Sequence, residues 1–220
     1  MGNLVPDVNR NVHPSSFSAS PIDASPASLI YDRAGNRKYL TAKERRAFLQ
    51  SAASMAPEIR TFCRMLAYTG ARISEILALT PGRIDEATRL VVLESLKKRR
   101  RGVFRAVPLP PEFLAELELV HELAKRRACT GLRSSRILPW GRTFAWMRVK
   151  EAMAAAHVLG PQASPKGLRH SFGVTALQAG VPINLVRRWL GHSRLTTTEI
   201  YTDAIGPEER AIAKRLWKTF

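Results

Sequence analysis

The fold and the chemistry of this chain are decided by the stretch Tyr68-Thr69-Gly70-Ala71-Arg72-Ile73-Ser74-Glu75-Ile76-Leu77-Ala78-Leu79. A helical pattern from about residue 58 runs into this stretch and stops at Gly70, a residue type that commonly ends helices. A second helical pattern, Ile73 to Leu79, ends at the break Thr80-Pro81-Gly82. Arg72 therefore stands at a helix start directly after a glycine turn, where backbone N–H groups and a guanidinium can share one anion.

Most of the chain on either side of this stretch is patterned as helix. Thr41 and Glu44 form a capping box that opens a helix reaching about Ala53. Ser164 is placed to cap a later helix, with Pro165 in its first turn. Further helices are predicted near residues 111–127, 142–157, 167–179, 183–190, 194–202 and 207–219.

Two short strands interrupt the helical pattern. Residues 89–94 and 103–107 are rich in Val, Leu and Phe, which is typical of strands, and they are predicted to pair as an antiparallel hairpin. The tip of this hairpin is strongly basic and contains Lys97, Lys98, Arg99, Arg100 and Arg101. The predicted fold class is therefore α+β, mainly α with a small antiparallel hairpin.

The first part of the chain differs from the rest. Residues 1–38 are rich in Pro, Ser, Asn and Asp and show neither a helical nor a strand period. Such composition predicts a disordered arm or linker. Residues 39–220 are then expected to form one domain, which includes the final helix.

The charge of the chain restricts its partners. Among 220 residues, 35 are Lys or Arg and 18 are Asp or Glu, giving a net charge of +17. This balance argues against a typical small-metabolite enzyme. It favours a protein that binds a polyanionic partner, either nucleic acid or an anionic membrane surface. No apolar run approaches the roughly 18 residues of a membrane span, and the N-terminus lacks a signal-peptide pattern. We expect a cytoplasmic, nucleoid-associated protein without a membrane partner.

Four distant segments hold residue types suited to phosphate chemistry. They are Thr69–Glu75, the hairpin tip with Lys97 and Lys98, Lys166-Gly167-Leu168-Arg169-His170, and Leu190-Gly191-His192-Ser193 with Tyr201 beyond it. Their order and spacing (192−169 is 23 and 201−192 is 9) resemble the catalytic domain of the tyrosine site-specific recombinases, the phage integrase family. The resemblance covers about residues 40–205.

The resemblance implies a DNA strand-transfer reaction. In this family a tyrosine attacks a phosphodiester, giving a 3′-phosphotyrosine and a free 5′-hydroxyl, and the covalent link conserves the bond energy for religation. By this likeness Tyr201 is the nucleophile and His192 donates a hydrogen bond to the phosphate. Arg72 and Arg169 stabilise charge on its non-bridging oxygens, a task suited to guanidiniums. No cofactor or metal is implied, and no metal-ligand spacing is visible.

A lysine of the hairpin tip is expected to protonate the leaving 5′-oxygen as general acid. Lys97 is preferred because it directly follows the strand, with Lys98 as the alternative.

One position departs from the family's pattern. Lys166 stands where the family usually has a histidine, three residues before Arg169. A lysine can still bind a phosphate, but it cannot act as a neutral imidazole base. His170 is interpreted as a support for its helix. Glu75 is either a charge partner of Arg72 or an ordinary acidic residue of a first helical turn.

Double-stranded DNA is the expected partner. Candidate contacts to its backbone are Lys98, Arg99, Arg100, Arg101, Arg187 and Arg188. The resemblance also implies a homotetramer on DNA, and a partner recombinase or accessory protein could supply the clamping for which the roughly 40 residues before the first helix are too few. The apolar stripe of the helix near 207–219 either docks into a neighbouring subunit or packs on the chain's own core.

Three other functions remain open from the sequence. The first is a DNA-binding regulator on the same fold that has lost cleavage. The second is relaxation of DNA by a type IB topoisomerase, which uses the same chemistry. The third is a nucleic-acid coat or RNA-binding protein that shares only the charge.

Overall fold

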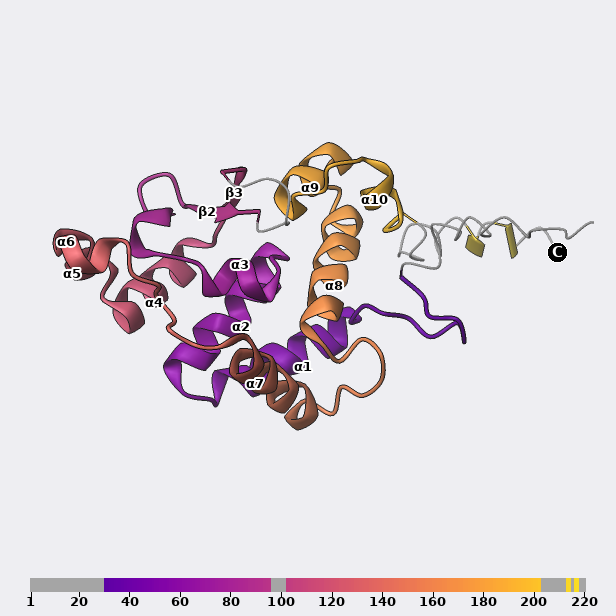
Figure 1. The fold of residues 1–220 in the computed structure, drawn as a ribbon. Coiled ribbons are helices and arrows are strands. Elements are labelled where there is room, and N and C mark those ends of the chain that lie inside the picture. Colours follow the sequence, from indigo (N-terminus) through magenta and orange to yellow (C-terminus); the bar gives the residue numbers. More distant parts are fainter. Residues whose placement is uncertain (1–29, 96–101, 203–212, 215, 218–220) are drawn as a thin grey trace, which may run out of the picture.

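The computed structural model describes residues 30–95, 102–202, 213–214 and 216–217. Its helices are α1 (Ala42–Ala53), α2 (Pro57–Thr69), α3 (Ile73–Leu77), α4 (Pro111–His121), α5 (Leu123–Ala128), α6 (Thr130–Arg133), α7 (Arg142–Ala155), α8 (Pro165–Gln178), α9 (Ile183–Leu190) and α10 (Thr196–Glu199). Its strands are β1 (Ile84–Asp85), β2 (Leu90–Glu94) and β3 (Phe104–Pro108), with a short 3-10 turn, η2, at Pro81–Arg83. In Figure 1, α8 runs from α1 at one end to α9 at the other, and α10 lies beside α9. The predicted class, mainly α with a small antiparallel sheet, is confirmed.

Local signals explain how the first helices begin and end. The hydroxyl of Thr41 accepts a hydrogen bond from the backbone N–H of Glu44, whose carboxylate accepts one from the N–H of Thr41. This capping box opens α1 as predicted. Gly70 ends α2 in the left-handed region, at φ +60°, and thereby turns the chain into α3.

The sheet is antiparallel, in the order β1-β2-β3. The β2–β3 hairpin was predicted, whereas the two-residue β1 is too short to leave a sequence pattern. Val91 pairs with Val107 and Leu93 pairs with Arg105, and all four side chains are buried. One charged residue, Arg105, thus occupies an inward position of β3. The basic tip of the hairpin, residues 96–101, lies outside the described residues.

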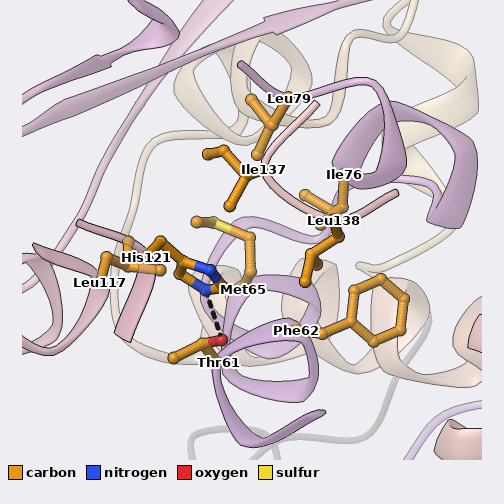
Figure 2. Close-up of a pocket in the computed structure, with 9 residues that line it drawn as sticks. All are labelled: Thr61, Phe62, Met65, Ile76, Leu79, Leu117, His121, Ile137 and Leu138. Carbon is orange, nitrogen blue, oxygen red and sulfur yellow. Dashed lines mark hydrogen bonds between the residues drawn. The ribbon is translucent and has the colours of Figure 1, made fainter. Parts of the chain in front are cut away.

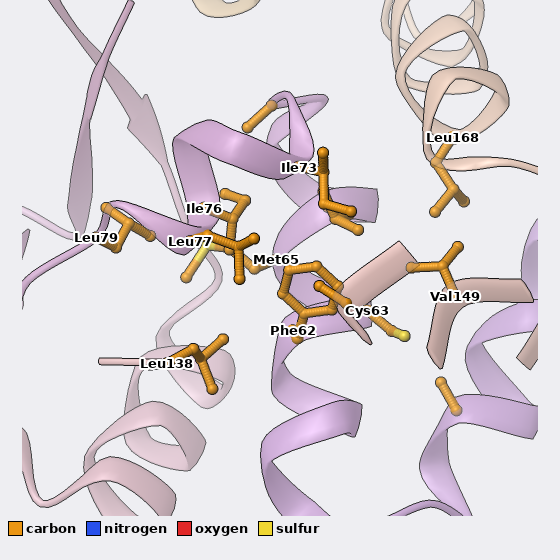
Figure 3. Close-up of a cluster of buried hydrophobic side chains, with 14 of the residues drawn as sticks. Phe62, Cys63, Met65, Ile73, Ile76, Leu77, Leu79, Leu138, Val149 and Leu168 are labelled. Atoms are coloured by element: carbon orange, nitrogen blue, oxygen red, sulfur yellow. The ribbon is translucent and has the colours of Figure 1, made fainter. Parts of the chain in front are cut away.

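The main core surrounds α2. Figure 3 shows the side chains that meet there from α2, α3, α7 and α8: Phe62, Cys63, Met65, Ile73, Ile76, Leu77, Val149 and Leu168. Cys63 is fully buried, and burial raises the pKa of its thiol to about 12. This cysteine is a small core residue.

A second, smaller core holds the last elements together. Val174 of α8, Val186 and Leu190 of α9, and Ile200 and Tyr201 after α10 pack in one cluster. These contacts fix the segment that carries Tyr201 against α8 and α9.

The predicted N-terminal arm needs a correction. Ile30 is fully buried in the second core cluster, and the backbone N–H of Lys38 donates to its carbonyl oxygen. Asp32 accepts hydrogen bonds from Ala34 and Asn36, which closes the turn between them. Residues 30–38 are therefore part of the folded domain, because one apolar residue in a polar stretch finds a place in the core. Residues 1–29 lie outside the described part of the chain.

The helix predicted over residues 111–127 is interrupted. Glu122 adopts φ +48°, which ends α4, and α5 starts immediately after it. The carboxylate of Glu118 accepts hydrogen bonds from the backbone N–H of Ala124 and so satisfies a donor exposed by the break. The prediction was wrong here because no Gly or Pro marks the break.

A buried polar pair lies next to the main core. Figure 2 shows His121 and Thr61 in a small, mostly apolar cavity, joined by a hydrogen bond of 2.9 Å between Nε2 and Oγ1. Burial lowers the pKa of His121 to about 4, so the imidazole is neutral at neutral pH. The folded protein therefore contains His121 as a neutral imidazole that is hydrogen-bonded to Thr61.

The end of the chain is described only in part. Residues 213–214 and 216–217 are helical, as predicted, and the side chains of Leu216 and Trp217 are exposed. Within the described residues, no helix is both long enough and apolar enough to cross a membrane.

Candidate active site

Four predicted site residues come together from separate elements. Arg72 caps the start of α3, Arg169 lies in α8, His192 follows α9 and Tyr201 follows α10. The charges of Arg72 and Arg169 both act on the hydroxyl of Tyr201, and the ring of His192 stacks on that of Tyr201 at 6.2 Å between centroids. The fold thus joins positions that are up to 129 residues apart in sequence (201−72).

Arg72 is held by Glu75. The carboxylate of Glu75 accepts hydrogen bonds from the backbone N–H of Arg72 (2.8 Å) and from its Nη1 (2.9 Å). The Arg72 side chain remains about one third exposed, whereas Glu75 is buried. Of the two interpretations of Glu75, the structure shows the charge partner.

A second arginine shares Glu75. Nη2 of Arg105, on β3, donates to Glu75 Oε2 at 2.5 Å. Burial pushes the pKa of Glu75 up, but the hydrogen bond and charge of Arg105, followed by those of Arg72, outweigh burial and hold this pKa below its ordinary value. Glu75 is therefore a buried carboxylate between two guanidiniums.

Arg169 ties two helix ends together. Its Nη1 donates to the carbonyl of Gly70 at 2.8 Å, and its Nη2 donates to the carbonyl of Leu190 at 2.6 Å. These carbonyls lie at the C-terminal ends of α2 and α9, where a cation is favoured. Burial, and then the charge of Arg72, lowers the pKa of Arg169 to about 10, so it remains a cation at neutral pH.

Tyr201 is enclosed by other side chains of the site. It is 2% exposed, and its hydroxyl lies 3.3 Å from Nδ1 of His170. Its ring packs on the backbone of α8 at Gly173, where a Cβ would come within 2.5 Å of the ring. Burial raises the pKa of Tyr201, and the charges of Arg169 and Arg72 offset this only in part. The phenol is therefore protonated and covered.

His170 has a closer relation to the site than predicted. The sequence suggested a support for the helix, but its ring contacts Tyr201 directly, edge to face. Burial, and then the charge of Lys166, lowers the pKa of His170 to about 4, so it is a neutral imidazole. A base of this pKa does not deprotonate a phenol whose pKa is raised. Tyr201 therefore stays a neutral phenol while it lies beside His170 in this arrangement.

His192 is oriented by its own neighbourhood. Its Nδ1 lies 3.0 Å from Oγ1 of the buried Thr198. Since Gly191 ends α9 just before it, the imidazole stands at the helix end, beside the ring of Tyr201.

The remaining predicted residues have mixed outcomes. Lys166 is exposed in the first turn of α8, near enough for its charge to act on His170. Arg187 and Arg188 line a groove between β3 and α9, together with His192 and Arg194. The predicted residues that lie outside the described part of the chain are Lys97, Lys98, Arg99, Arg100 and Arg101.

Three contributors went unrecognised in the sequence as parts of the site. Arg105 leaves a signal, because a charged residue in the inward register of a strand needs a buried partner. Gly173 leaves a weaker one, as a glycine inside a helix. The contact of His170 with Tyr201 joins two distant segments and leaves none.

The arrangement suits transfer of a phosphoryl group. Two cations act on one hydroxyl through their charges and a histidine stacks on its ring, which provides charge stabilisation beside a nucleophile. Within the described ranges, no group of three or more His, Cys, Asp or Glu residues is placed to hold a metal ion.

Comparison with known proteins agrees with this geometry. Residues 38–205 match the model of the phage integrase family. The chain belongs to the phage integrase family. This integrase-family chain is 31% identical over 162 residues to tyrosine recombinase XerC of Mycobacterium bovis, a match covering 71% of the chain and 53% of the relative. It is 34% identical over 153 residues to tyrosine recombinase XerD of Mycobacterium tuberculosis, covering 65% and 47%.

Solved structures share the fold. The integrase-family chain is similar to XerH site-specific recombinase bound to palindromic difH substrate, with a TM-score of 0.68 and 20% identity over 85% of this chain and 56% of that one. It is also similar to the catalytic domain of bacteriophage HP1 integrase, with a TM-score of 0.58 and 20% identity over 80% and 93% of the two chains. The chain spans about half the length of the curated relatives it matches.

Proposed function

We propose that this chain is the catalytic part of a site-specific DNA recombinase that cuts and rejoins strands through a 3′-phosphotyrosine at Tyr201. The observation that carries the proposal is that the charges of Arg72 and Arg169 act on the hydroxyl of Tyr201 while the ring of His192 stacks on the ring of Tyr201. A regulator that only binds DNA has no need for two cations beside an enclosed phenol. The net charge of +17 suits a double-stranded DNA substrate, and the place of action is then the nucleoid.

The chemical step forms one bond and breaks one. Oη of Tyr201 bonds to the scissile phosphorus while the bond from phosphorus to the 5′-oxygen breaks. The proton of the phenol passes to solvent or a neighbouring base, and the 5′-oxygen takes a proton from Lys97, with Lys98 as the alternative. Arg72 and Arg169 neutralise charge on the non-bridging oxygens, His192 and Lys166 add hydrogen bonds, and the reaction needs no metal.

Tyr201 must be uncovered before it can attack. Reaction requires the hydroxyl to lie within about 3–3.5 Å of phosphorus, yet the residue is 2% exposed and faces His170. Bound DNA therefore moves Tyr201 away from His170, which frees its hydroxyl.

Assembly on DNA belongs to the same proposal. Recombination joins two duplexes, so we propose a homotetramer, with the final helix as the connector and with a partner recombinase or accessory protein where one is required. Arg187, Arg188 and the basic hairpin tip, residues 98–101, hold the DNA backbone.

Covalent capture tests this function. The chain is mixed with a pool of nicked duplexes of random core sequence in buffer containing EDTA, and protein–DNA adducts that resist denaturant are collected and sequenced. We expect adducts from the wild type that share a core sequence and none from Tyr201→Phe, which retains duplex binding. Binding without adducts would favour the regulator, and relaxation of a supercoiled plasmid without strand exchange would favour the topoisomerase.

A further inference from the structure

Arg105 is a nearly buried arginine that binds both a carboxylate and the end of a helix. Its side chain is only 5% exposed, although it belongs to a short strand at the edge of the site. Nη2 donates to Glu75 at 2.5 Å, and Nε donates to the carbonyl of Trp189 at 2.7 Å. One guanidinium therefore joins β3, α3 and the end of α9.

Glu75 links Arg105 to Arg72, because its carboxylate binds both residues. Oε2 of Glu75 accepts from both Arg105 Nη2 and the backbone N–H of Arg72, while Oε1 accepts from Arg72 Nη1. The position of the Arg72 guanidinium thus depends on where Glu75 lies. Because Glu75 is fully buried, its position is set by these hydrogen bonds and by packing.

The contact with Trp189 leads to His192. Trp189 and Leu190 are the last residues of α9, and their carbonyls accept from Arg105 and Arg169 respectively. Gly191 follows at φ +68°, and a Cβ there would lie 3.1 Å from Nη1 of Arg105. A glycine at this position lets the guanidinium lie against the turn that presents His192.

We propose that Arg105 is a positioning residue for DNA cleavage, which fixes Arg72 through Glu75 and His192 through the end of α9. The role rests on the proposed function, since it concerns groups that meet the scissile phosphate. Lysine cannot replace Arg105, because a single ammonium lacks the planar fork that reaches both acceptors.

A change of substrate separates positioning from general support of the fold. A methylphosphonate at the cleavage site lacks one charged oxygen, so its transition state gains less from a well-placed Arg72 than that of a phosphodiester. The duplex recovered by wild-type covalent capture is made in both forms, and the single-turnover rate of adduct formation is measured on each.

Arg105→Lys is expected to slow adduct formation roughly 100-fold on the phosphodiester but less than about 10-fold on the methylphosphonate, with duplex affinity nearly unchanged. Glu75→Gln is expected to show the same preference, which keeps the test available if Arg105→Lys does not fold. Arg83→Lys is the matched control, because Arg83 pairs with Glu94 beside the same sheet and lies outside the site. We expect its rate ratio to equal that of the wild type.

Equal rate losses on the two substrates, or no loss in a folded Arg105→Lys, would overturn the role of Arg105 and leave the proposed function intact. A wild-type chain that forms no adduct on any duplex of the pool would overturn the proposed function, and the role of Arg105 with it.

Discussion

The ring of Tyr201 lies on the backbone of α8, and the residue at the point of contact is Gly173. A glycine within a helix costs about 0.5–1 kcal/mol relative to alanine. Glycine is nevertheless required at this position, because any side chain here would overlap the tyrosine ring. The ring of His170 meets the tyrosine ring edge to face, and the ring of His192 stacks on it.

Gly173→Ala is expected to push Tyr201 out of its resting place. The added Cβ would come within 2.5 Å of the ring, and overpacking of about 1–3 kcal/mol outweighs a gain in helix propensity of at most about 1 kcal/mol. Tyr201 should become more reactive toward tetranitromethane in the variant, as measured by peptide mass spectrometry. Unchanged nitration of Tyr201 would show that the ring does not depend on this contact, with nitration of Tyr68 as the internal reference.

Single residues were predictable to different degrees. The motifs identified four residues, Arg72, Arg169, His192 and Tyr201. The residue types and the spacing that define these motifs can be read directly from the sequence. The enclosure of Tyr201 by His170 was not predictable, since it depends on how the residues after α10 pack against α8. Arg105 stood in a predicted strand with alternating burial, so its inward register could have been recognised, but its partners could not.

At the level of elements, the site is built at helix ends. α2 and α9 finish beside one another, and Arg169 binds a terminal carbonyl of each. Arg105 binds a further carbonyl of α9. Cations satisfy carbonyls that a helix end leaves without partners. The same two guanidiniums thus stabilise the ends of these helices and bring α3, α8 and α9 together.

The β2–β3 hairpin is expected to supply the general acid. Lys97→Ala should block cleavage of ordinary DNA, whereas a substrate with a 5′-thio leaving group should restore it, because sulfur leaves without a proton. Gel-based rates of adduct formation on the two substrates measure this rescue. If Lys98→Ala is rescued and Lys97→Ala is not, the acid is Lys98.

Elements with explicit end signals were predictable. The capping box of Thr41 and Glu44, the stop at Gly70 and the cap at Ser164 all lie where the sequence indicated. The break at Glu122 was not, because a left-handed glutamate is fixed by its surroundings and not by its own preference. The burial of Ile30 could not be predicted either, because it depends on a cluster of residues that are distant from it in the sequence.

At the scale of the whole molecule, stability should depend on pH through buried neutral histidines. Folding lowers the pKa of His121 and of His170 to about 4, against about 6.5 in an unfolded chain. As the pH falls, these histidines are protonated in the unfolded chain before they are protonated in the folded one. The stability that their neutral forms give the folded state is therefore complete above about pH 6.5 and is lost as the pH falls toward 4.

Urea unfolding should therefore give a free energy lower by about 1–2 kcal/mol per histidine at pH 5 than at pH 7.5. His121→Gln should keep a polar partner for Thr61 and remove about half of this difference, while leaving DNA cleavage at pH 7.5 intact. A difference that is unchanged in the variant would contradict the buried, neutral state of His121.

The final helix is expected to act between subunits. Leu216 and Trp217 are 56% and 60% exposed, so the described part of this helix presents apolar surface of the kind that subunit contacts cover. Deleting residues 207–220 should spare the folded core and single-site binding, but weaken assembly of two-site complexes and strand exchange in gel-shift and recombination assays. Unfolding of the truncated chain, or recombination at the full rate, would exclude this connector.

The assignment of the nucleophile can be read from the DNA-linked peptide itself. The chain contains four tyrosines, Tyr31, Tyr39, Tyr68 and Tyr201. After covalent capture, nuclease and protease digestion, mass spectrometry locates the residue that carries the nucleotide. We predict a 3′-nucleotide on Tyr201 and none on the other three. A nucleotide on any other residue, or capture without a modified Tyr201, would contradict the active site described above.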